Sequence, residues 1–437
     1  MADARRHHST CVIGAGPCGL TAIRNLRAQG IDDMVCHEAM DATGGLWAYS
    51  ADPGRPSVYD SAHIISSKRL SDFRGFPMPE TYPDFPSHRQ ILAYFRAYAE
   101  RFDLNRHVRL NSKVETAERR QGGGWRLTVS DADGRHEETA DNLVVAAGHH
   151  RIAFTPELAG RFDGTQMHSA DYRSAEGFAG KRVLVVGAGN SACDIAAALA
   201  RIADHVSVSL RTPQYVVPKT VFGRPIDIQY RKLQKLPRAI RDAVLQRGLR
   251  LIVGPYARYG LPQPSAHVLS THPTLNTDIL EQLTHGKVTV RRATVSAEGT
   301  QVRFADGETA SFDTIIWATG YVTRFDFLKD RRFDWSDSLR LPLYMKIFPV
   351  EMDDIFFVGL IQPLGCIWTL ADYQSELVAH AIAGRWRRPA DMAARLTREH
   401  AVDAARFRNT ARHAVEVDFH DYLRLMRQEL GGVRAAA

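Results

Sequence analysis

Phe162-Asp163-Gly164-Thr165-Gln166-Met167-His168-Ser169-Ala170-Asp171-Tyr172 lies about midway between two glycine-rich loops, and its position decides the fold. The first loop is Gly14-Ala15-Gly16-Pro17-Cys18-Gly19, and the second is Gly187-Ala188-Gly189-Asn190-Ser191-Ala192. Each loop follows a short apolar run and opens a helical pattern, as in a dinucleotide-binding unit. Alone, the pattern F-x-G-x-x-x-H-x-x-x-Y would indicate an ordinary turn. Between two such loops, this junction stretch (residues 162–172) is predicted to lie where two nucleotide-binding domains meet.

The first loop has the residues that a dinucleotide-binding fold places around a diphosphate. Residues 10–14 indicate a buried strand that runs into a tight turn. Gly14 allows the turn, Gly16 lets the backbone approach the diphosphate, and Gly19 lets the helix pack on the strand. A second strand ends in Glu38, 24 positions after Gly14, where a carboxylate can accept hydrogen bonds from a ribose.

The order of the motifs along the chain resembles a known family. Besides the two loops and the junction stretch, the chain carries Gly44-Gly45-Leu46-Trp47, Ser66-Ser67-Lys68, Trp317-Ala318-Thr319-Gly320-Tyr321 and Gly359-Leu360-Ile361-Gln362-Pro363. From residue 10 to about residue 380, this set is similar to class B flavin monooxygenases, and more closely to the flavin-containing monooxygenases that oxygenate heteroatoms. The resemblance implies an NADPH-dependent enzyme with bound FAD, which uses molecular oxygen and a small nucleophilic substrate.

The second loop differs from the first at the end of its second strand. Ala192 replaces the third glycine, which is an accepted variant of the fingerprint. Arg211 lies 24 positions after Gly187, where the first loop has its acid. A carboxylate favours a free ribose hydroxyl, whereas a guanidinium pairs with a 2′-phosphate. We therefore assign FAD to the first loop and NADPH to the second, the latter through Gly187, Gly189, Asn190, Ser191, Arg211 and Thr212.

The resemblance also assigns residues to the flavin. Gly45, Leu46 and Trp47 are expected to line it, with Trp47 near the ring, because paired glycines permit backbone close to a flat ligand. A surface turn with one packed tryptophan is the alternative. Gln362 leads to a helix near residue 369, whose N-terminus can point at the flavin pyrimidine. The predicted cofactor-binding set is completed by Val114 and Tyr172.

Residues 57–68, here called the contact segment, contain the main departure from the family. Relatives have an asparagine there that helps to hold the oxygenated flavin, and counting from Tyr59 and Lys68 places Ile65 at that position. Because an alkyl side chain cannot hydrogen-bond, either Ser66 or His63 substitutes, or the oxygenated flavin is less protected. The candidate catalytic residues are Ile65, Ser66 and His63.

We expect an α/β fold with two dinucleotide-binding (Rossmann-like) domains, in which the NADPH domain is inserted into a discontinuous FAD domain. Residues 1–155 form the first part of the FAD domain, including a small antiparallel meander before the strand at 143–147. Residues 156–309 form the NADPH domain. Residues 310–437 return to the FAD domain with a buried strand at 313–318, and end in amphipathic helices.

An insert at residues 213–272 of the NADPH domain has an amphipathic, basic pattern that Pro237 divides. A solvated basic face is favoured over a helix on a membrane surface. No apolar run reaches the roughly 18 residues of a membrane span. The N-terminus lacks an apolar signal core, so we expect a cytoplasmic protein, and the sequence leaves a homodimer open.

The net charge of +7 favours anionic partners such as the two cofactors, and no basic run interleaved with aromatics indicates nucleic acid. The five cysteines form no C-x-x-C pair, which argues against a disulfide framework, a zinc knuckle and a redox dithiol. His149 and His150 suggest a metal site, but neighbours on an extended chain point in opposite directions. We therefore expect no metal.

The reaction that the resemblance implies begins with hydride transfer from NADPH to FAD. Oxygen then gives a flavin hydroperoxide, retained NADP⁺ shields it, and an amine nitrogen or a sulfide sulfur takes the distal oxygen. A Baeyer–Villiger monooxygenase acting on ketones is one alternative, but its junction motif normally ends in Trp-Pro, where this chain has Tyr172-Arg173. An uncoupled NADPH oxidase that produces hydrogen peroxide is the other, and Ile65 favours it.

Overall fold

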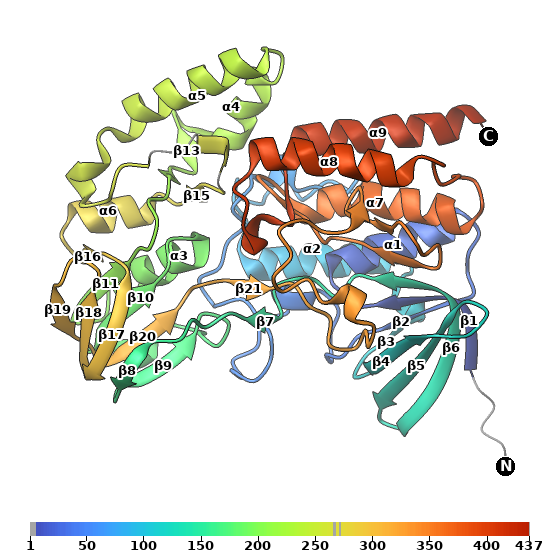
Figure 1. Cartoon of the computed structure of the whole chain (residues 1–437), viewed down its shortest axis with the longest axis horizontal. Helices are drawn as coiled ribbons and strands as arrows, with labels where there is room; N and C mark the ends of the chain where they lie inside the picture. The colour runs from blue at the N-terminus through green and yellow to red at the C-terminus, as the bar shows by residue number, and fades with distance from the viewer. Residues whose placement is uncertain (1–5, 265–267, 271, 437) are drawn as a thin grey trace.

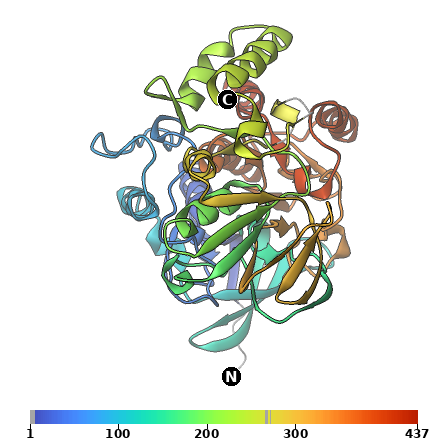
Figure 2. The ribbon, with the colours of Figure 1, turned by 90° about the vertical axis from the view of Figure 1, so that its left-hand side faces the viewer.

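The computed structural model describes residues 6–264, 268–270 and 272–436, and it places two open sheets side by side (Figure 1). The N-terminal part of the chain and the C-terminal helices surround the first sheet. The middle of the chain forms the second sheet. Figure 2, viewed from the side of the second sheet, shows that the two helices of the insert (residues 213–272) project beyond both sheets.

The first sheet has the strand order β3-β2-β1-β6-β5-β4, and β24 also pairs with β6. Its strands are β1 (Arg6–Ile13), β2 (Met34–His37), β3 (Val108–Arg109), β4 (Lys113–Arg119), β5 (Trp125–Asp131), β6 (Gly134–Val145) and β24 (Ile355–Phe357). The pairs of β1 with β2 and β6 are parallel, whereas β4, β5 and β6 form an antiparallel meander. The predicted meander and the predicted buried strand therefore share one long strand, β6.

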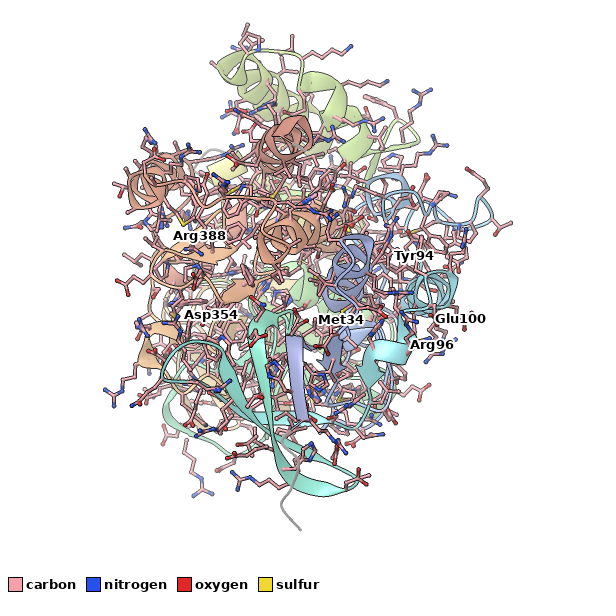
Figure 3. All side chains as sticks on the ribbon, turned by 90° about the vertical axis from the view of Figure 1, so that its right-hand side faces the viewer. Met34, Tyr94, Arg96, Glu100, Asp354 and Arg388 are labelled. Carbon is pink, nitrogen blue, oxygen red and sulfur yellow. The ribbon has the colours of Figure 1, made fainter. Side chains whose placement is uncertain are left out.

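Five helices accompany this sheet: α1 (Pro17–Ala28), α2 (His88–Arg101), α7 (Ile367–Ile382), α8 (Met392–Arg406) and α9 (Phe419–Ala436). Ser87 caps α2 as predicted, in a reciprocal capping box with Gln90. Figure 3 shows Arg96 and Glu100 on the outer side of α2, whereas Tyr94 lies in the buried core with Met34 of β2. This amphipathic pattern makes α2 part of the core rather than of a cofactor site.

The second sheet is parallel throughout, with the order β16-β11-β10-β20-β9. Its strands are β9 (Thr165–His168), β10 (Arg182–Val186), β11 (His205–Ser209), β16 (Val288–Arg291) and β20 (Thr314–Trp317), with helices α3 (Asn190–Leu199) and α6 (Asp278–Thr284). A smaller sheet is formed by β8 (Ala159–Phe162), β17 (Thr294–Gly299), β18 (Gln301–Phe304) and β19 (Thr309–Ser311).

The strand that we expected to begin the second part of the FAD domain lies in the second sheet instead. β20 pairs with β10 on one side and with β9 on the other. All four of its residues are buried, as a central strand of a parallel sheet requires. The chain therefore leaves the second sheet only after Trp317, and not at residue 310.

Two crossing connections join the halves of the molecule. The outgoing chain forms β7 (Ile152–Ala153), and it pairs antiparallel with β21 (Tyr321–Val322) of the returning chain. The predicted backbone crossing at Ala318-Thr319-Gly320-Tyr321 thus lies beside the outgoing crossing. Further short pairs are β22 (Leu343–Tyr344) with β23 (Phe348–Pro349), and β25 (Gln362–Pro363) with β26 (Glu416–Val417).

The insert forms a helical pair at the top of the view in Figure 1. The insert contains β12 (Val216–Val217), β13 (Thr220–Val221), β14 (Arg224–Pro225), α4 (Ile226–Leu233) and α5 (Arg238–Val253). Strand β15 (Thr274–Leu275) directly follows the insert. Pro237 lies between the two helices, as predicted. The outer face of α5 is apolar as well as basic, because Ile240, Val244 and Leu251 are exposed beside Arg247. In the part of the chain that the structure describes, no helix has the length and apolar character needed to cross a membrane.

Candidate functional site

The first loop (Gly14–Gly19) is built by close backbone packing. Gly14 has φ of +99°, and a β-carbon there would come within 2.8 Å of the carbonyl oxygen of Ala146. A β-carbon on Gly19 would lie only 1.8 Å from the carbonyl oxygen of Gly14. At Gly16, by contrast, a β-carbon would meet nothing nearer than Gly45, at 3.6 Å. The packing requires glycine at the first and third positions, and the middle position leaves the open cradle that a diphosphate of FAD fits.

Glu38 lies at the end of β2, where its carboxylate reaches the same loop. Its Oε2 accepts a hydrogen bond from the Ala15 N–H at 2.7 Å, and its Oε1 accepts one from the Met40 N–H at 2.9 Å. Burial raises the pKa of Glu38, and these two hydrogen bonds oppose that rise. Each oxygen keeps a second lone pair, so the carboxylate can still accept a ribose hydroxyl.

The Gly44–Trp47 loop packs against the first loop. The Gly44 N–H donates to the carbonyl of Ala15 at 2.9 Å, and the carbonyl of Leu46 accepts from Val58 at 2.9 Å. The Trp47 ring meets the edge of Trp368, with centroids 5.8 Å apart. Gly45, Leu46 and Trp47 therefore lie between the first loop, the contact segment and helix α7.

The contact segment (residues 57–68) touches both halves of the molecule. The Tyr59 hydroxyl donates to Oδ2 of Asp194, on helix α3 of the second sheet, at 2.7 Å. The backbone N–H of Ser67 donates to Oδ2 of Asp227, on helix α4 of the insert, at 2.6 Å. Burial raises the pKa of Asp194. Asp194 and Asp227 were not in the predicted site, because only the folded chain brings these helices to the contact segment.

The three candidate catalytic residues have different surroundings. Ile65 is half-buried. The hydroxyl of Ser66 is buried and lies 2.9 Å from the hydroxyl of Ser71. His63 is exposed, and its Nδ1 lies 3.0 Å from the carbonyl oxygen of Ser61. Ser66 and His63 are therefore both already in polar contacts with residues nearby in the chain, whereas Ile65 contributes an apolar surface.

The junction stretch is divided between a strand and a contact. Residues 165–168 form β9, inside the second sheet. Tyr172 is buried, its ring packs edge-on against Tyr59 at 5.9 Å, and its hydroxyl has no hydrogen-bond partner among the described residues. The next residue, Arg173, donates to the carbonyls of Asp52 and Pro53 in the first half. The end of the stretch and the next residue, Arg173, thus join the two halves.

Val114 and Gln362 have different neighbours in the first half. Val114 is buried on β4, two residues after Ser112, whose N–H donates to the carbonyl of Glu38 at 2.8 Å. The side-chain carbonyl of Gln362 lies 3.2 Å from Nε2 of His149, before the start of helix α7. Val114 is therefore close to the Glu38 backbone, and Gln362 is at the crossing between the halves.

The second loop (Gly187–Ala192) is fastened by residues far away in the sequence. Gly187 has φ of +136°, and a β-carbon there would lie 2.3 Å from the carbonyl oxygen of Ala318. The Thr274 hydroxyl donates to the Ala188 carbonyl at 2.6 Å. The side-chain oxygen of Asn190 accepts from the Leu275 N–H at 2.9 Å. We assigned Asn190 to cofactor binding, but its side-chain oxygen is thus already used to attach strand β15.

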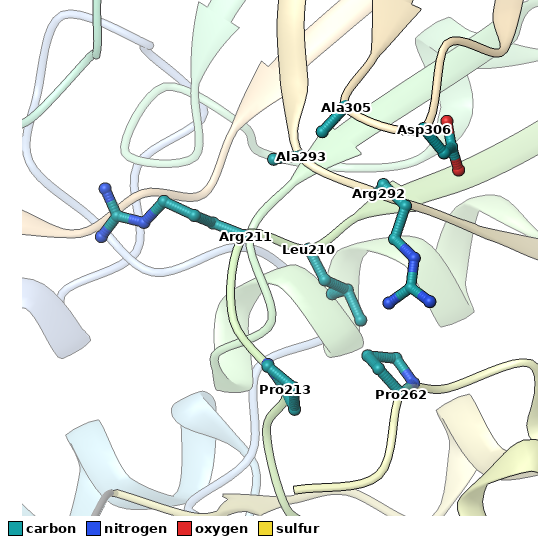
Figure 4. Close-up of a pocket in the computed structure, with 8 residues that line it drawn as sticks. All are labelled: Leu210, Arg211, Pro213, Pro262, Arg292, Ala293, Ala305 and Asp306. Carbon is teal, nitrogen blue, oxygen red and sulfur yellow. The ribbon is translucent and has the colours of Figure 1, made fainter.

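A cavity of about 240 Å³ lies at the carboxyl edge of the second sheet (Figure 4). It is lined by Leu210, Arg211, Pro213, Pro262, Arg292, Ala293, Ala305 and Asp306. Figure 4 shows the exposed Arg211 side chain directed away from Pro262, whereas the Arg292 guanidinium points toward Pro262. Thr212 follows Arg211 and is half-buried.

Arg292 was not among the residues predicted from the sequence. It directly follows strand β16, which pairs in parallel with β11, the strand that leads to Arg211. Because the carboxyl ends of parallel strands share one edge of a sheet, the two arginines lie at the same edge. An arginine directly after strand β16 was the sequence signal that could have identified Arg292 as a site residue.

The expectation that His149 and His150 point in opposite directions was wrong. Their ring centroids are 4.2 Å apart, and His150 also packs on Tyr321 at 5.1 Å. Gly148, with φ of +71°, turns the chain out of the extended conformation on which the expectation rested. Burial lowers the pKa of both histidines. The described residues contain no group of three or more side chains that could bind a metal ion.

Comparison with known proteins identifies the family. The model of the family described as "Flavin-binding monooxygenase-like" matches residues 7–434, so the chain belongs to this family. Human "Flavin-containing monooxygenase 5" is 32% identical over 445 residues, which cover 97% of this chain and 82% of the relative. Rat "Dimethylaniline monooxygenase [N-oxide-forming] 2" is 31% identical over 442 residues, which cover 96% of this chain and 82% of that relative.

Solved structures agree with the fold. The S-allyl-L-cysteine S-oxygenase from Allium sativum has a TM-score of 0.71 at 24% identity, over 99% of this chain and 90% of the other. The cyclohexanone monooxygenase from Rhodococcus sp. Phi1, bound to NADP⁺, has a TM-score of 0.73 at 20% identity, over 99% of this chain and 98% of the other. The protein is thus a mixed α/β, FAD-dependent NADPH monooxygenase.

Proposed function

We propose that this protein uses NADPH and molecular oxygen to oxygenate a soft nucleophile, an amine nitrogen or a sulfide sulfur, with FAD at the first loop and NADPH at the second. The observation that carries the proposal is the double attachment of the contact segment. Through Tyr59 and Asp194 it reaches the helix of the second loop, and through Leu46 and Val58 it reaches the predicted flavin loop. Two cofactors bound at these loops would meet beside this segment.

The domain assignment follows from the same geometry. We assign the FAD domain to the first sheet with α1, α2 and α7 to α9, and the NADPH domain to the second sheet, its smaller sheet and the insert. The return to the FAD domain is then placed after Trp317, because β20 belongs to the second sheet. The inserted arrangement is supported by the two crossings, β7 and β21, which lie side by side.

The residues around the proposed flavin position mainly orient it and exclude water. FAD supplies the transfer of electrons from NADPH to oxygen when it is bound. Trp47 and Ile65 offer apolar surface, and Glu38 and the first loop position the ribose and the diphosphate. None of the three candidate catalytic residues is placed as a general acid or base, since His63 is exposed and Ser66 is engaged with Ser71. We therefore assign them to orientation and shielding.

The nature of the substrate is supported from two sides. One relative is named for N-oxide formation, and one similar structure is named as an S-oxygenase. A ketone substrate is suggested by the likeness to cyclohexanone monooxygenase. However, Tyr172 and Arg173 stand where ketone-oxygenating relatives have Trp-Pro, and the Arg173 side chain is committed to backbone carbonyls of residues 52–55. Heteroatom oxygenation is therefore the function that we favour.

The test uses the FAD-loaded protein with NADPH and oxygen-18 gas. N,N-dimethylaniline, methyl phenyl sulfide and cyclohexanone are offered separately, and products are identified by mass spectrometry while NADPH consumption is followed. We expect singly labelled N-oxide or sulfoxide in amounts that track NADPH. A labelled lactone as the main product would favour the Baeyer–Villiger alternative. Hydrogen peroxide without any organic product would favour the uncoupled oxidase.

A further inference from the structure

A short C-terminal segment, residues 408–417, returns from helix α8 to the second loop. The Arg408 N–H donates to the carbonyl of Ser270 at 3.1 Å, and the carbonyl of Val415 accepts from the Gln362 N–H at 2.7 Å. Within this segment, the turn Ala411–His413 lies beside the crossing strand β21. The segment therefore meets the insert, the crossing and the end of the first half at one place.

Arg412 of this segment lies directly over the second loop. Its Nη2 would be 3.4 Å from a β-carbon on Gly189, and no other side chain that the structure describes is as close to that position. Gly189 is the middle glycine of the loop and the N-cap of α3. Arg412 is exposed to solvent, and no hydrogen bond or ion pair joins it to a residue that the structure describes. An unpaired guanidinium thus stands where the loop is open.

The electrostatic surroundings of Arg412 favour an anion. Although part of the Arg412 side chain is exposed, the protein packed around its guanidinium lowers the pKa of Arg412. The carboxylate of Glu416 opposes this effect, and the charge of Arg211 lowers the pKa further. Arg211 approaches from the second sheet, whereas Arg412 approaches from the C-terminal segment. Two like charges from two parts of the fold thus act on each other beside a loop whose helix N-terminus also carries positive potential. A polyanion between them would relieve the repulsion.

We propose that Arg412 binds the diphosphate of the nicotinamide dinucleotide, and that it reaches this group from the C-terminal segment rather than from the second sheet. The proposal rests on the proposed function, in which the second loop binds NADPH. The middle glycine is where the backbone approaches a diphosphate, whereas the residue after the second strand reaches the 2′-phosphate. Arg211 and Arg412 therefore have separate roles. Arg211 selects NADPH over NADH, whereas Arg412 helps to bind either dinucleotide.

The experiment measures dissociation constants by calorimetry for the FAD-loaded wild type, Arg412→Gln and Arg211→Ala. NADP⁺, NAD⁺ and 2′-AMP are the probes, because 2′-AMP carries the 2′-phosphate without a diphosphate. Removal of a charge-assisted hydrogen bond at Arg412 should weaken NADP⁺ and NAD⁺ by the same factor, roughly 10- to 150-fold. Binding of 2′-AMP should be unchanged. Arg211→Ala should instead weaken NADP⁺ and 2′-AMP and leave NAD⁺ unaffected.

Two further variants keep the result interpretable. Arg408→Gln removes one positive charge from the same segment and should leave binding of both dinucleotides within about twofold of wild type, since that charge acts only at long range and is screened. Arg412→Lys keeps the charge without the planar fork and should give an intermediate loss. The FAD content of every variant serves as the control for folding.

Three outcomes would overturn the proposal. Arg412→Gln could bind both dinucleotides as tightly as wild type, or it could lose NADP⁺ selectively, which would place Arg412 at the 2′-phosphate. An equal loss in Arg408→Gln would show that general charge alone is responsible. If wild type binds neither dinucleotide while Arg211→Ala and Arg412→Gln retain FAD, the proposed function itself fails, and this inference fails with it.

Discussion

The two glycine loops have the same pattern but are held in different ways. In the first loop, Glu38 and Gly44 bind the backbone of Ala15, and all of these residues lie within a short stretch of the same half. The second loop is attached instead by Thr274 and Leu275, far along the chain. The first loop is therefore complete within its own fold unit, whereas the second is completed by remote segments.

This difference fits the tasks of the two cofactors. A resident cofactor such as FAD benefits from a site that is already organised before binding, because less order has to be imposed. NADPH has to bind and leave in every cycle, so its site can depend on contacts between segments that are remote in the chain. We infer that changes at the first loop act mainly on folding and FAD retention. Changes at the second loop should act mainly on the affinity for the dinucleotide.

The largest expected effect is at Gly19. Because its β-carbon would lie 1.8 Å from the Gly14 carbonyl oxygen, Gly19→Ala forces helix α1 away from β1. We expect a loss of about 4 kcal/mol or more in the free energy of unfolding, measured on the FAD-free protein by thermal or urea unfolding. Gly16→Ala is the matched control. Its β-carbon meets only ordinary contacts, so the protein should fold, while its affinity for FAD falls.

A Gly19→Ala protein as stable as wild type would contradict the packing argument. A Gly16→Ala protein that retains FAD as wild type does would contradict the placement of the diphosphate. The larger change Gly16→Val extends the same test, since a branched side chain would fill the cradle. We expect Gly16→Val protein to purify without the yellow colour of FAD.

The next effect concerns the choice of nicotinamide cofactor. Arg211→Ala should weaken NADPH by roughly 10- to 150-fold and leave NADH nearly unchanged, since a charge-assisted contact contributes about 1.5–3 kcal/mol. Arg292→Ala should act in the same selective direction, because Arg292 lines the same cavity. The measurement is KM for both cofactors. Equal KM values for NADPH and NADH in the wild type would remove the basis of the assignment.

Acid should affect the two regions at different pH values. Burial lowers the pKa of His413, beside the second loop, to about 4. The folded protein keeps His413 neutral, whereas the unfolded chain can protonate it below the ordinary histidine pKa of about 6.5. The folded state is therefore fully stable above about pH 6.5 and loses stability as the pH falls toward 4. After allowance for solvent screening, the loss should be roughly 1–2 kcal/mol.

In the first sheet, burial alone would raise the pKa of Glu138. Contacts of Glu138 with His37 and His136, and the nearby His8 ring, together outweigh burial and hold the pKa of Glu138 well below its usual range. The stability contributed by this carboxylate is present above its ordinary pKa of about 4.3 and is lost only as the pH falls below that value. Between about pH 6.5 and 4.5, therefore, the C-terminal segment should loosen before the first sheet does.

Hydrogen exchange followed by mass spectrometry can compare residues 408–417 with residues 134–145. After correction for the intrinsic pH dependence of exchange, protection of residues 408–417 should fall between about pH 6.5 and pH 4.5, while residues 134–145 keep theirs. His413→Gln should reduce the pH dependence at the C-terminal segment. Equal loss of protection in both regions would show that the difference in titration has no structural consequence.

The smallest expected effect is at Ile65. A missing hydrogen bond in a buried site is worth about 1 kcal/mol, which corresponds to roughly fivefold in a rate. We expect the wild type to be active but to release hydrogen peroxide when no substrate is present. Ile65→Asn should reduce the peroxide released per NADPH consumed. If the wild type is tightly coupled and Ile65→Asn releases more peroxide, then Ser66, His63 or a backbone group performs the role, and the alignment of the contact segment is wrong.

Local patterns in the sequence predicted much of the fold. Both glycine loops, their strands and the cap at Ser87 depend on residues close together in the chain, so hydrophobic periodicity and turn chemistry were sufficient. The position of Glu38 at the end of β2 followed from the regular length of a strand, helix and strand unit. The predicted division of the insert at Pro237 was likewise a local effect.

The remaining features depend on pairing between distant segments. The four residues of β20 identify a buried strand, but nothing in them indicates which sheet receives it. Arg292 and Arg412 become meaningful only when β16 and the C-terminal segment are brought to the second loop. The orientation of His149 and His150 depends on the turn at Gly148. The expectation of alternating side-chain directions assumed an extended chain and could not predict this turn.

Stopped-flow absorbance can show whether an exchangeable NADP⁺ stays beside a resident FAD and shields it, as the difference between the two loops implies. FAD-loaded protein is reduced, then mixed with oxygen in the presence or absence of NADP⁺, and reoxidation of the flavin is followed. We predict that NADP⁺ slows reoxidation by about tenfold or more, since even one buried contact of about 1.4 kcal/mol produces that factor. Equal rates of reoxidation with and without NADP⁺ would contradict the shielding of FAD by NADP⁺.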